Sequence, residues 1–192
     1  MRDGFLIDTS VQETHNHYSV HQATEILSDG LLAQLDALQL RASKVALFFK
    51  IPDARRSLIH YDVAFENGAW KKNIAAINWN LTASRSTMCW YDVHGEIEVE
   101  PEPNPKDEPP EWYFCLNGVH FGFRRNMDIP EDKITCLESA EIYGATLVRT
   151  DIAHAIINAD TSGRWALSVR FDPDFESWAD AVNAFRPVLA AA

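Results

Sequence analysis

Two side chains that bind metals stand two positions apart in the segment "SLIHYDVAF", residues 57–65. This apolar run is typical of a β-strand, and residues i and i+2 of a strand point to the same face. We therefore predict that the imidazole of His60 and the carboxylate of Asp62 project together. They would supply two of the three ligands of a facial triad, in which two histidines and one carboxylate hold iron(II) and leave other positions open.

The third ligand of such a triad has to be a histidine on a neighbouring strand. His154 lies in "DIAHAIIN", residues 151–158, a second run with the composition of a strand. The predicted metal ligands are therefore His60, Asp62 and His154. No catalytic side chain beyond these ligands is predicted.

An arginine follows the distal histidine by ten positions, because Arg164 begins the run "RWALSVRF". A turn through residues 160–163 is expected to bring this strand back alongside that of His154. A buried guanidinium needs an anionic partner, and a dicarboxylate could chelate a metal with one end and bind arginine with the other. Arg170 has the same strand parity as Arg164, so which of the two binds the anion stays open.

The order His60-x-Asp62, His154 and Arg164 resembles the 2-oxoglutarate/iron(II)-dependent dioxygenases. The segment "AAINWNLTASRSTMCWYDV" is similar to small bacterial and phage members and to enzymes like the aspartyl/asparaginyl and prolyl hydroxylases. The resemblance covers roughly residues 44–171. It implies a double-stranded β-helix (jelly roll, cupin-like) and an oxidoreductase that hydroxylates a small molecule or an amino-acid side chain with iron(II) and 2-oxoglutarate. Many family members carry Arg-x-Ser, whereas here Ala166 stands two positions after Arg164.

The same resemblance implies roles for polar and aromatic residues on two strands that would line the pocket. Asn78 and Ser86 are expected to assist Arg164 in binding the cosubstrate. The expected substrate pocket has three members: Trp90, Asn80 and Met88. Strand alternation leaves open which residues of 78–80 and 86–91 face inward.

The elements that must position these residues are mainly strands, flanked by helices at both ends. We predict one domain over residues 1–192, with N-terminal helices in 1–43, a β core in 44–171 and a C-terminal helix in 172–192. A capping box at Ser19–Gln22 would begin the first helix, and Ser28 or Asp29 would cap a second. The last helix is expected to begin near residues 172–174. Strands are expected in nine runs: 44–50, 57–63, 73–81, 86–93, 112–116, 134–139, 145–150, 153–158 and 164–171.

An acidic, proline-rich insertion at residues 95–112 interrupts the predicted strands. Within it, residues 96–111 hold seven acidic residues and one lysine, which is −6 of the chain's net charge of −11. The overall charge makes nucleic acid and anionic membranes poor partners. The three cysteines form no CxxC pair, so reduced thiols and a cytoplasmic location are expected.

Three other interpretations of the sequence remain open. The chain could be a non-catalytic or degenerate jelly-roll binding module, or a metal-dependent cupin that does not use 2-oxoglutarate. His17 and His21 could form a zinc pair, but a helix that begins at Ser19 would spoil their spacing. Asn158 is read as a turn residue. Neither the substrate nor the oligomeric state is predicted.

Overall fold

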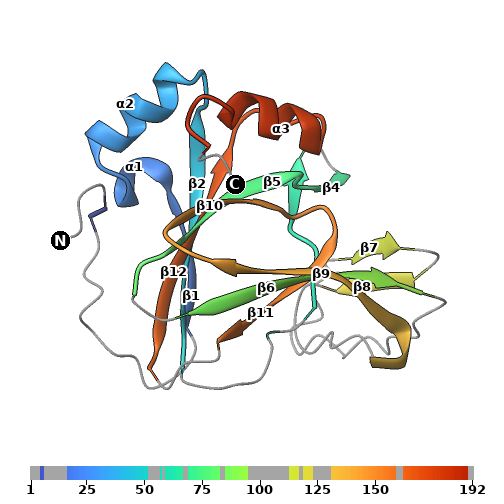
Figure 1. Ribbon diagram of the computed structural model, residues 1–192. Helices are drawn as coiled ribbons and strands as arrows, with labels where there is room; N and C mark the ends of the chain where they lie inside the picture. The colour runs from blue at the N-terminus through green and yellow to red at the C-terminus, as the bar shows by residue number, and fades with distance from the viewer. Residues whose placement is uncertain are drawn as a thin grey trace, which may run out of the picture.

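A computed structural model of the chain shows a mainly β protein with few helices (Figure 1). It describes residues 5–6, 17–51, 57, 59–66, 69–82, 85–94, 113–116, 119–122, 131–158 and 162–189, without the side chains of residues 63–70, 113–116 and 119–122. The predicted acidic insertion at 95–112 and the predicted turn residues 160–161 lie outside this range. No helix in the described part of the chain is long and apolar enough to cross a membrane.

The larger of the two main sheets has five antiparallel strands in the order β1-β2-β12-β5-β10. Its members are β1 (His17–Gln22), β2 (Ala42–Lys50), β12 (Arg164–Phe171), β5 (Ala75–Asn80) and β10 (Ala145–Arg149). β12 lies at the centre, between β2 and β5. This central place explains why nearly every side chain of β12 is buried.

The smaller main sheet has three antiparallel strands in the order β11-β6-β9. Its members are β11 (Ala153–Asn158), β6 (Ser86–Val93) and β9 (Ile134–Ile142). A short 3-10 helix, Glu131–Lys133, leads into β9. Two further hairpins are formed by β3 (Val63–Glu66) with β4 (Ala69–Lys72) and by β7 (Tyr113–Leu116) with β8 (Val119–Gly122).

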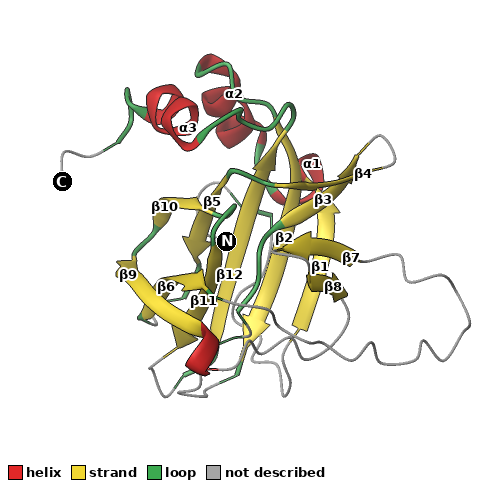
Figure 2. Ribbon diagram, turned by 90° about the vertical axis from the view of Figure 1, so that its right-hand side faces the viewer, coloured by secondary structure: helices red, strands yellow, loops and turns green. Residues whose placement is uncertain are grey.

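The α-helices of the described residues are α1 (Ala23–Ile26), α2 (Asp29–Ala37) and α3 (Trp178–Phe185), and their apolar side chains pack in one cluster with residues of one face of the five-stranded sheet. Helices α2 and α3 lie at the same end of the molecule in both views (Figures 1 and 2). Apolar side chains of the helices, such as Ile26, Leu35 and Phe185, share one core cluster with alternate residues of β12, such as Leu167 and Val169. The other face of the five-stranded sheet is therefore free to turn toward the three-stranded sheet.

A second apolar cluster joins the two sheets. It combines Ala76 of β5 and Val148 of β10 with Met88 of β6 and Ile156 of β11. Because side chains alternate between the two faces along a strand, these contacts show which residues of each strand face the other sheet, and we call this face inward. On β12 the inward residues are Arg164, Ala166, Ser168 and Arg170; on β11 they are His154, Ile156 and Asn158; on β6 they are Ser86, Met88 and Trp90.

The predicted N-terminal helix start is wrong. Ser19 lies in the edge strand β1, and the capping box is made by Gln22 and Glu25 at the start of α1. Ser28 caps α2 as one of the two predicted alternatives, since its side chain accepts a hydrogen bond from the Leu31 amide. The polar alternation of "HYSVHQ" suits a strand that is solvated on its edge.

Two further expectations about strands are corrected. The described residues of the run before β3, which are 57 and 59–62, do not form a strand; His60 makes an isolated antiparallel bridge with His154. The strand of Arg164 does not lie alongside that of His154 either, because β12 and β11 belong to different sheets. The last helix begins at Trp178, after its cap Ser177, and so later than predicted.

Candidate metal centre

An isolated β-bridge brings two of the predicted ligands together. The His60 amide donates to the His154 carbonyl at 3.0 Å, and the His154 amide donates to the His60 carbonyl at 2.9 Å. The two imidazole rings then lie with their centroids 4.5 Å apart. A segment outside the sheets is thus fixed against β11 at the position where its side chains are needed.

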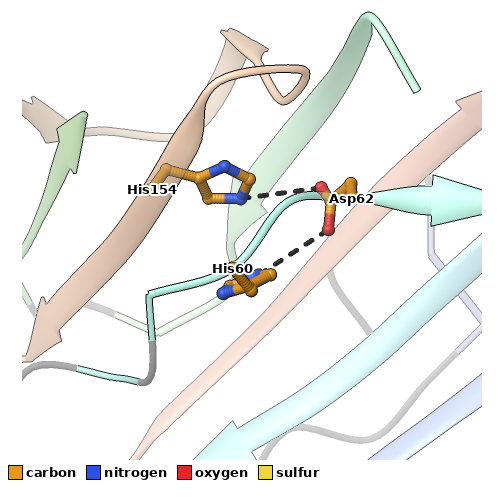
Figure 3. Close-up of side chains that lie close together, drawn as sticks. All are labelled: His60, Asp62 and His154. Atoms are coloured by element: carbon orange, nitrogen blue, oxygen red, sulfur yellow. Dashed lines mark ion pairs between the residues drawn. The ribbon is translucent and has the colours of Figure 1, made fainter. Parts of the chain in front are cut away.

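Asp62 completes the group, as Figure 3 shows. Its backbone amide donates to the Thr150 carbonyl at 3.2 Å, and its carbonyl accepts from the Asn73 amide at 2.8 Å. Its carboxylate lies between the histidines: Oδ1 is 3.6 Å from His60 Nε2, and Oδ2 is 3.7 Å from His154 Nε2. One ligand atom from each residue lies within 4.8 Å of the other two, so these three residues could hold a metal ion.

The tautomer of His154 suits a metal ligand. Its Nδ1 lies 2.8 Å from the Ile152 carbonyl oxygen, and a carbonyl can only accept, so Nδ1 carries the proton. Nε2 therefore turns its lone pair toward Asp62 and His60, the arrangement usual for histidine ligands. Burial lowers the pKa of His154 to about 4, so the ring is neutral at pH 7.

The carboxylate of Asp62 is kept ionised by its neighbours. Burial by itself raises the pKa of this group, but the positive charge and the hydrogen bond of Arg170 outweigh burial and hold the pKa well below its usual range. Arg170 Nη2 donates to Asp62 Oδ2. Both side chains are largely buried, with 16% and 20% of their surface exposed.

Arg170 belongs to the five-stranded sheet and His154 to the three-stranded sheet. Because Asp62 contacts both side chains, the triad sits where the two inward faces meet. Arg170 also lies near Thr150, with Nη1 3.4 Å from Thr150 Oγ1. Thr150 in turn donates to the Asn73 carbonyl at 2.9 Å, so Arg170 is held at both ends of its guanidinium.

Arg164 lies on the same inward face of β12, but its surroundings differ. It is 1% exposed, and its Nε and Nη2 have no hydrogen-bond partner among the described residues. The guanidinium carbon lies 5.4 Å from the ring centroid of Phe48. Burial lowers the pKa of Arg164 to about 10, which leaves the group charged at pH 7. A buried cation without an anion is costly, so this position is suited to an anionic ligand.

Other inward-facing polar atoms lie buried without a hydrogen-bond partner in the described part of the chain. They are Asn78 Oδ1, Ser168 Oγ, Ser86 Oγ and Asn158 Oδ1. Strand register places them in two opposed pairs, Asn78 beside Ser168 and Ser86 beside Asn158. Native interiors rarely leave such groups unpaired unless water or a ligand meets them. The space between the sheets therefore carries the donors and acceptors of a polar binding site.

The structure places the predicted pocket residues in different surroundings. Asn80 shares the inward face of β5 with Asn78, and its Oδ1 accepts from Thr82 at 3.2 Å. Met88 is fully buried in the apolar cluster between the sheets, with Trp90 packed against it. The Trp90 indole donates to the Arg149 carbonyl at 2.8 Å. Their predicted roles toward cosubstrate and substrate stay predictions.

Sequence reasoning missed two members of the inward face. Asn158 was read as a turn residue, yet it ends β11 and is fully buried, opposite Ser86. Ser168, four positions after Arg164, is an inward hydroxyl on the same strand. Strand parity with Arg164 was the signal that could have found it, whereas the register of Asn158 with Ser86 needs the fold.

The remaining candidates are also placed. His17 and His21 lie on one face of β1 and both contact the Ser19 hydroxyl, at 3.2 and 2.8 Å. The thiols of Cys89 and Cys136 are free, as the sequence predicts for these two. Cys115 lies on β7, where side chains are outside the described part.

Comparison with known proteins gives no family assignment. No protein-family model matches the chain, and no curated protein is significantly similar to it.

Proposed function

We propose that this protein is an iron(II)- and 2-oxoglutarate-dependent oxygenase that hydroxylates a small molecule or an amino-acid side chain. The observation that carries the proposal is the buried guanidinium of Arg164, whose Nε and Nη2 have no hydrogen-bond partner among the described residues, on the same inward face that meets a His-Asp-His group. One feature fits a divalent metal, the other an anion. A short dicarboxylate with a chelating end is a ligand that uses both.

The donor set fits iron(II). Two imidazole nitrogens and one carboxylate oxygen form the combination found in non-haem iron(II) oxygenases, and the Nδ1 contact of His154 with the Ile152 carbonyl favours its metal-binding tautomer. His60, Asp62 and His154 would hold the ion. When bound, the iron would supply oxygen activation, and the protein would supply the geometry and a dry pocket.

The interior between the sheets fits the cosubstrate. Arg164 would form a charge-assisted pair with the distal carboxylate of 2-oxoglutarate. Two further hydroxyls, Ser86 and Ser168, are buried and free to donate. Ser168 would serve in place of the serine that many family members carry two positions after the arginine. Asn78, opposite Ser168, would orient the same end of the ligand.

Two opposed antiparallel sheets with a ligand site between them are compatible with a jelly roll, and we propose that architecture for residues 44–171. A small-molecule or peptide substrate would then enter from the side of His60, whose side chain is 43% exposed. A cytoplasmic location and the absence of a nucleic-acid partner belong to the same proposal and rest on composition alone.

The test is an anaerobic titration of metal-free protein, first with iron(II) and then with 2-oxoglutarate. Wild type should develop the visible charge-transfer band of the chelate. His154→Ala should show no band. Arg164→Ala should need on the order of 10-fold to 100-fold more 2-oxoglutarate, the value of one lost charge-assisted pair. Arg149→Ala is the matched control, because Arg149 pairs with Asp151 and not with any of the three proposed ligands, and it should behave as wild type.

Two outcomes would overturn the proposal. No band in wild type, with no more iron bound than in His154→Ala, would leave a binding module without a metal centre. Iron binding in wild type and Arg164→Ala alike, with no response to 2-oxoglutarate, would indicate a metal-dependent cupin with other chemistry.

A further inference from the structure

The two oxygens of the Asp62 carboxylate have different partners. Oδ2 accepts from Arg170 Nη2 and faces His154 Nε2 at 3.7 Å. Oδ1 faces His60 Nε2 at 3.6 Å and takes no bond from Arg170. A carboxylate can bind a metal through one oxygen or through both, so a cation fixed on one oxygen affects this choice.

We propose that Arg170 is a positioning residue that makes Asp62 a one-oxygen metal ligand. By holding Oδ2, it leaves only Oδ1 for the ion. The inference rests on the metal centre of the proposed function and goes beyond it, because it assigns a task to a residue that binds neither metal nor cosubstrate. With a metal bound, Asp62 would then take up one coordination position instead of two and leave the other for an incoming ligand.

Three contacts make Arg170 suited to this task. Its guanidinium is held on Asp62 by Nη2 and near Thr150 by Nη1, which fixes the plane of the group. Thr150 is itself tied to the segment that carries Asp62, since its carbonyl accepts from the Asp62 amide. The side chain is only 16% exposed, so water competes weakly for Oδ2. An arginine fork in such a frame is a rigid hydrogen-bond donor.

Two other groups that face Asp62 do not replace this function. His60 and His154 turn their Nε2 atoms to the carboxylate, but as metal ligands they need those lone pairs for the ion. No other cationic side chain pairs with Asp62 among the described residues. Removal of Arg170 would therefore release Oδ2 toward the metal.

The experiment counts the water molecules bound to Mn(II), a redox-stable probe that prefers oxygen ligands in octahedral geometry. Electron spin echo spectroscopy in deuterated water gives the count without any substrate or turnover. Arg170→Met should carry one bound water fewer than wild type, because Asp62 would occupy two positions instead of one. Arg170→Lys keeps a single donor for Oδ2 and should retain the wild-type count.

The matched control is Arg164→Met, on the same inward face of the same strand. It should keep the wild-type water count, because Arg164 makes no contact with Asp62 among the interactions described. If Arg170→Met does not fold, Arg170→Gln, whose side chain is too short to reach Oδ2, carries the same expectation.

The outcomes separate this inference from the proposed function. An unchanged water count in Arg170→Met, or an equal loss in Arg164→Met, would overturn the role of Arg170 while the metal centre stands. A wild-type protein that binds no Mn(II) and no iron(II) would remove the centre itself, and the inference with it.

Discussion

Arg164 and Arg170 share one strand and one face, but they solve the problem of a buried charge in opposite ways. Arg170 is neutralised within the protein by Asp62 and is further held by Thr150. Arg164 is more deeply buried and has a ring, Phe48, but no carboxylate among the described residues. The difference shows that a candidate anion-binding site is recognised by a buried cation for which the described residues supply no anionic partner. A guanidinium that is already paired in the protein more often orders its neighbours.

The largest effect should come from removal of Asp62, the carboxylate that pairs with Arg170 and not with Arg164. Asp62→Ala takes away a proposed metal ligand and also leaves Arg170 largely buried without its carboxylate partner. Iron(II) affinity should fall by on the order of 100-fold or more, and the free energy of unfolding by about 3 kcal/mol. Isothermal titration and denaturant unfolding measure the two. Asp151→Ala, which breaks the Arg149 pair instead, should leave iron affinity unchanged; an equal loss there would mean that the triad is misassigned.

Acid should destabilise the protein through the groups around Arg170, because Asp62 pairs with Arg170 and His154 lies beside Asp62. The pKa of His154 is about 4 when folded against an ordinary value of 6.5, so between these values the unfolded chain binds more protons. Stability of the metal-free protein should therefore fall by about 3 kcal/mol as pH drops from 6.5 to 4. Asp62, with its lowered pKa, adds a further loss below its unfolded value of 3.8.

Denaturant unfolding at a series of pH values measures this slope. His154→Asn should flatten it between pH 6.5 and 4. His94→Asn is the control, since His94 is exposed and contacts Thr135 at the surface. A slope that persists in His154→Asn would place the titrating group elsewhere.

Replacement of each arginine by methionine should give stability changes of opposite sign. Arg170→Met leaves the largely buried Asp62 carboxylate without its cationic partner. It should lower the free energy of unfolding by roughly 3 kcal/mol. Arg164→Met removes an unpartnered charge from the ligand-free protein and should raise it by roughly 1 kcal/mol. Thermal or denaturant unfolding of the two variants side by side gives the sign. If both destabilise equally, Arg164 has an internal anionic partner and is no ligand site.

The smallest effect concerns the hydroxyl that stands between the two arginines. Ser168→Ala should change the stability of ligand-free protein by less than about 1 kcal/mol, because the hydroxyl has no described partner. Affinity for 2-oxoglutarate should fall by roughly tenfold, the low end of the value of one hydrogen bond to a charged group. Ser139→Ala, on the exposed strand β9, should alter neither. Unchanged affinity in Ser168→Ala would restrict the anion site to Arg164.

Much of the site could be predicted because its signals are local. The spacing of His60 and Asp62 places both side chains together even though the segment forms only a bridge. The runs of β6 and β12 carry enough β-branched and aromatic residues, with turn signals nearby, to give their bounds as observed. Alternation then assigns inward and outward residues once one contact on each strand is known.

Strand partners could not be predicted in the same way. β12 pairs with β2 and β5 rather than with β11, because long-range pairing depends on the packing of whole faces and leaves no local mark. The bond between Arg170 and Asp62 depends on that topology, and so it was missed. Strand β1 does have a local signal, because polar and apolar residues alternate in "HYSVHQ". The capping-box pattern in the same residues predicts a helix start instead.

The bridge between His60 and His154 has a kinetic consequence. Two backbone hydrogen bonds join these residues, and the neighbouring residues 57, 59, 61 and 62 lie outside the strands. The segment is also held by bonds from Ser57 to Ile156 and from Asp62 to Thr150, and by Ile59 and Tyr61 in an apolar cluster with β6 and β11. Opening of the ligand set therefore requires these local contacts to break, but it does not require the two main sheets to separate.

The exchange rate of a bound metal should follow the rate at which the His60–His154 bridge opens. The amide protons of His60 and His154 should exchange with solvent at the same rate. A bound metal would slow both exchange rates, because an ion held by the two imidazoles stabilises the closed state of the bridge.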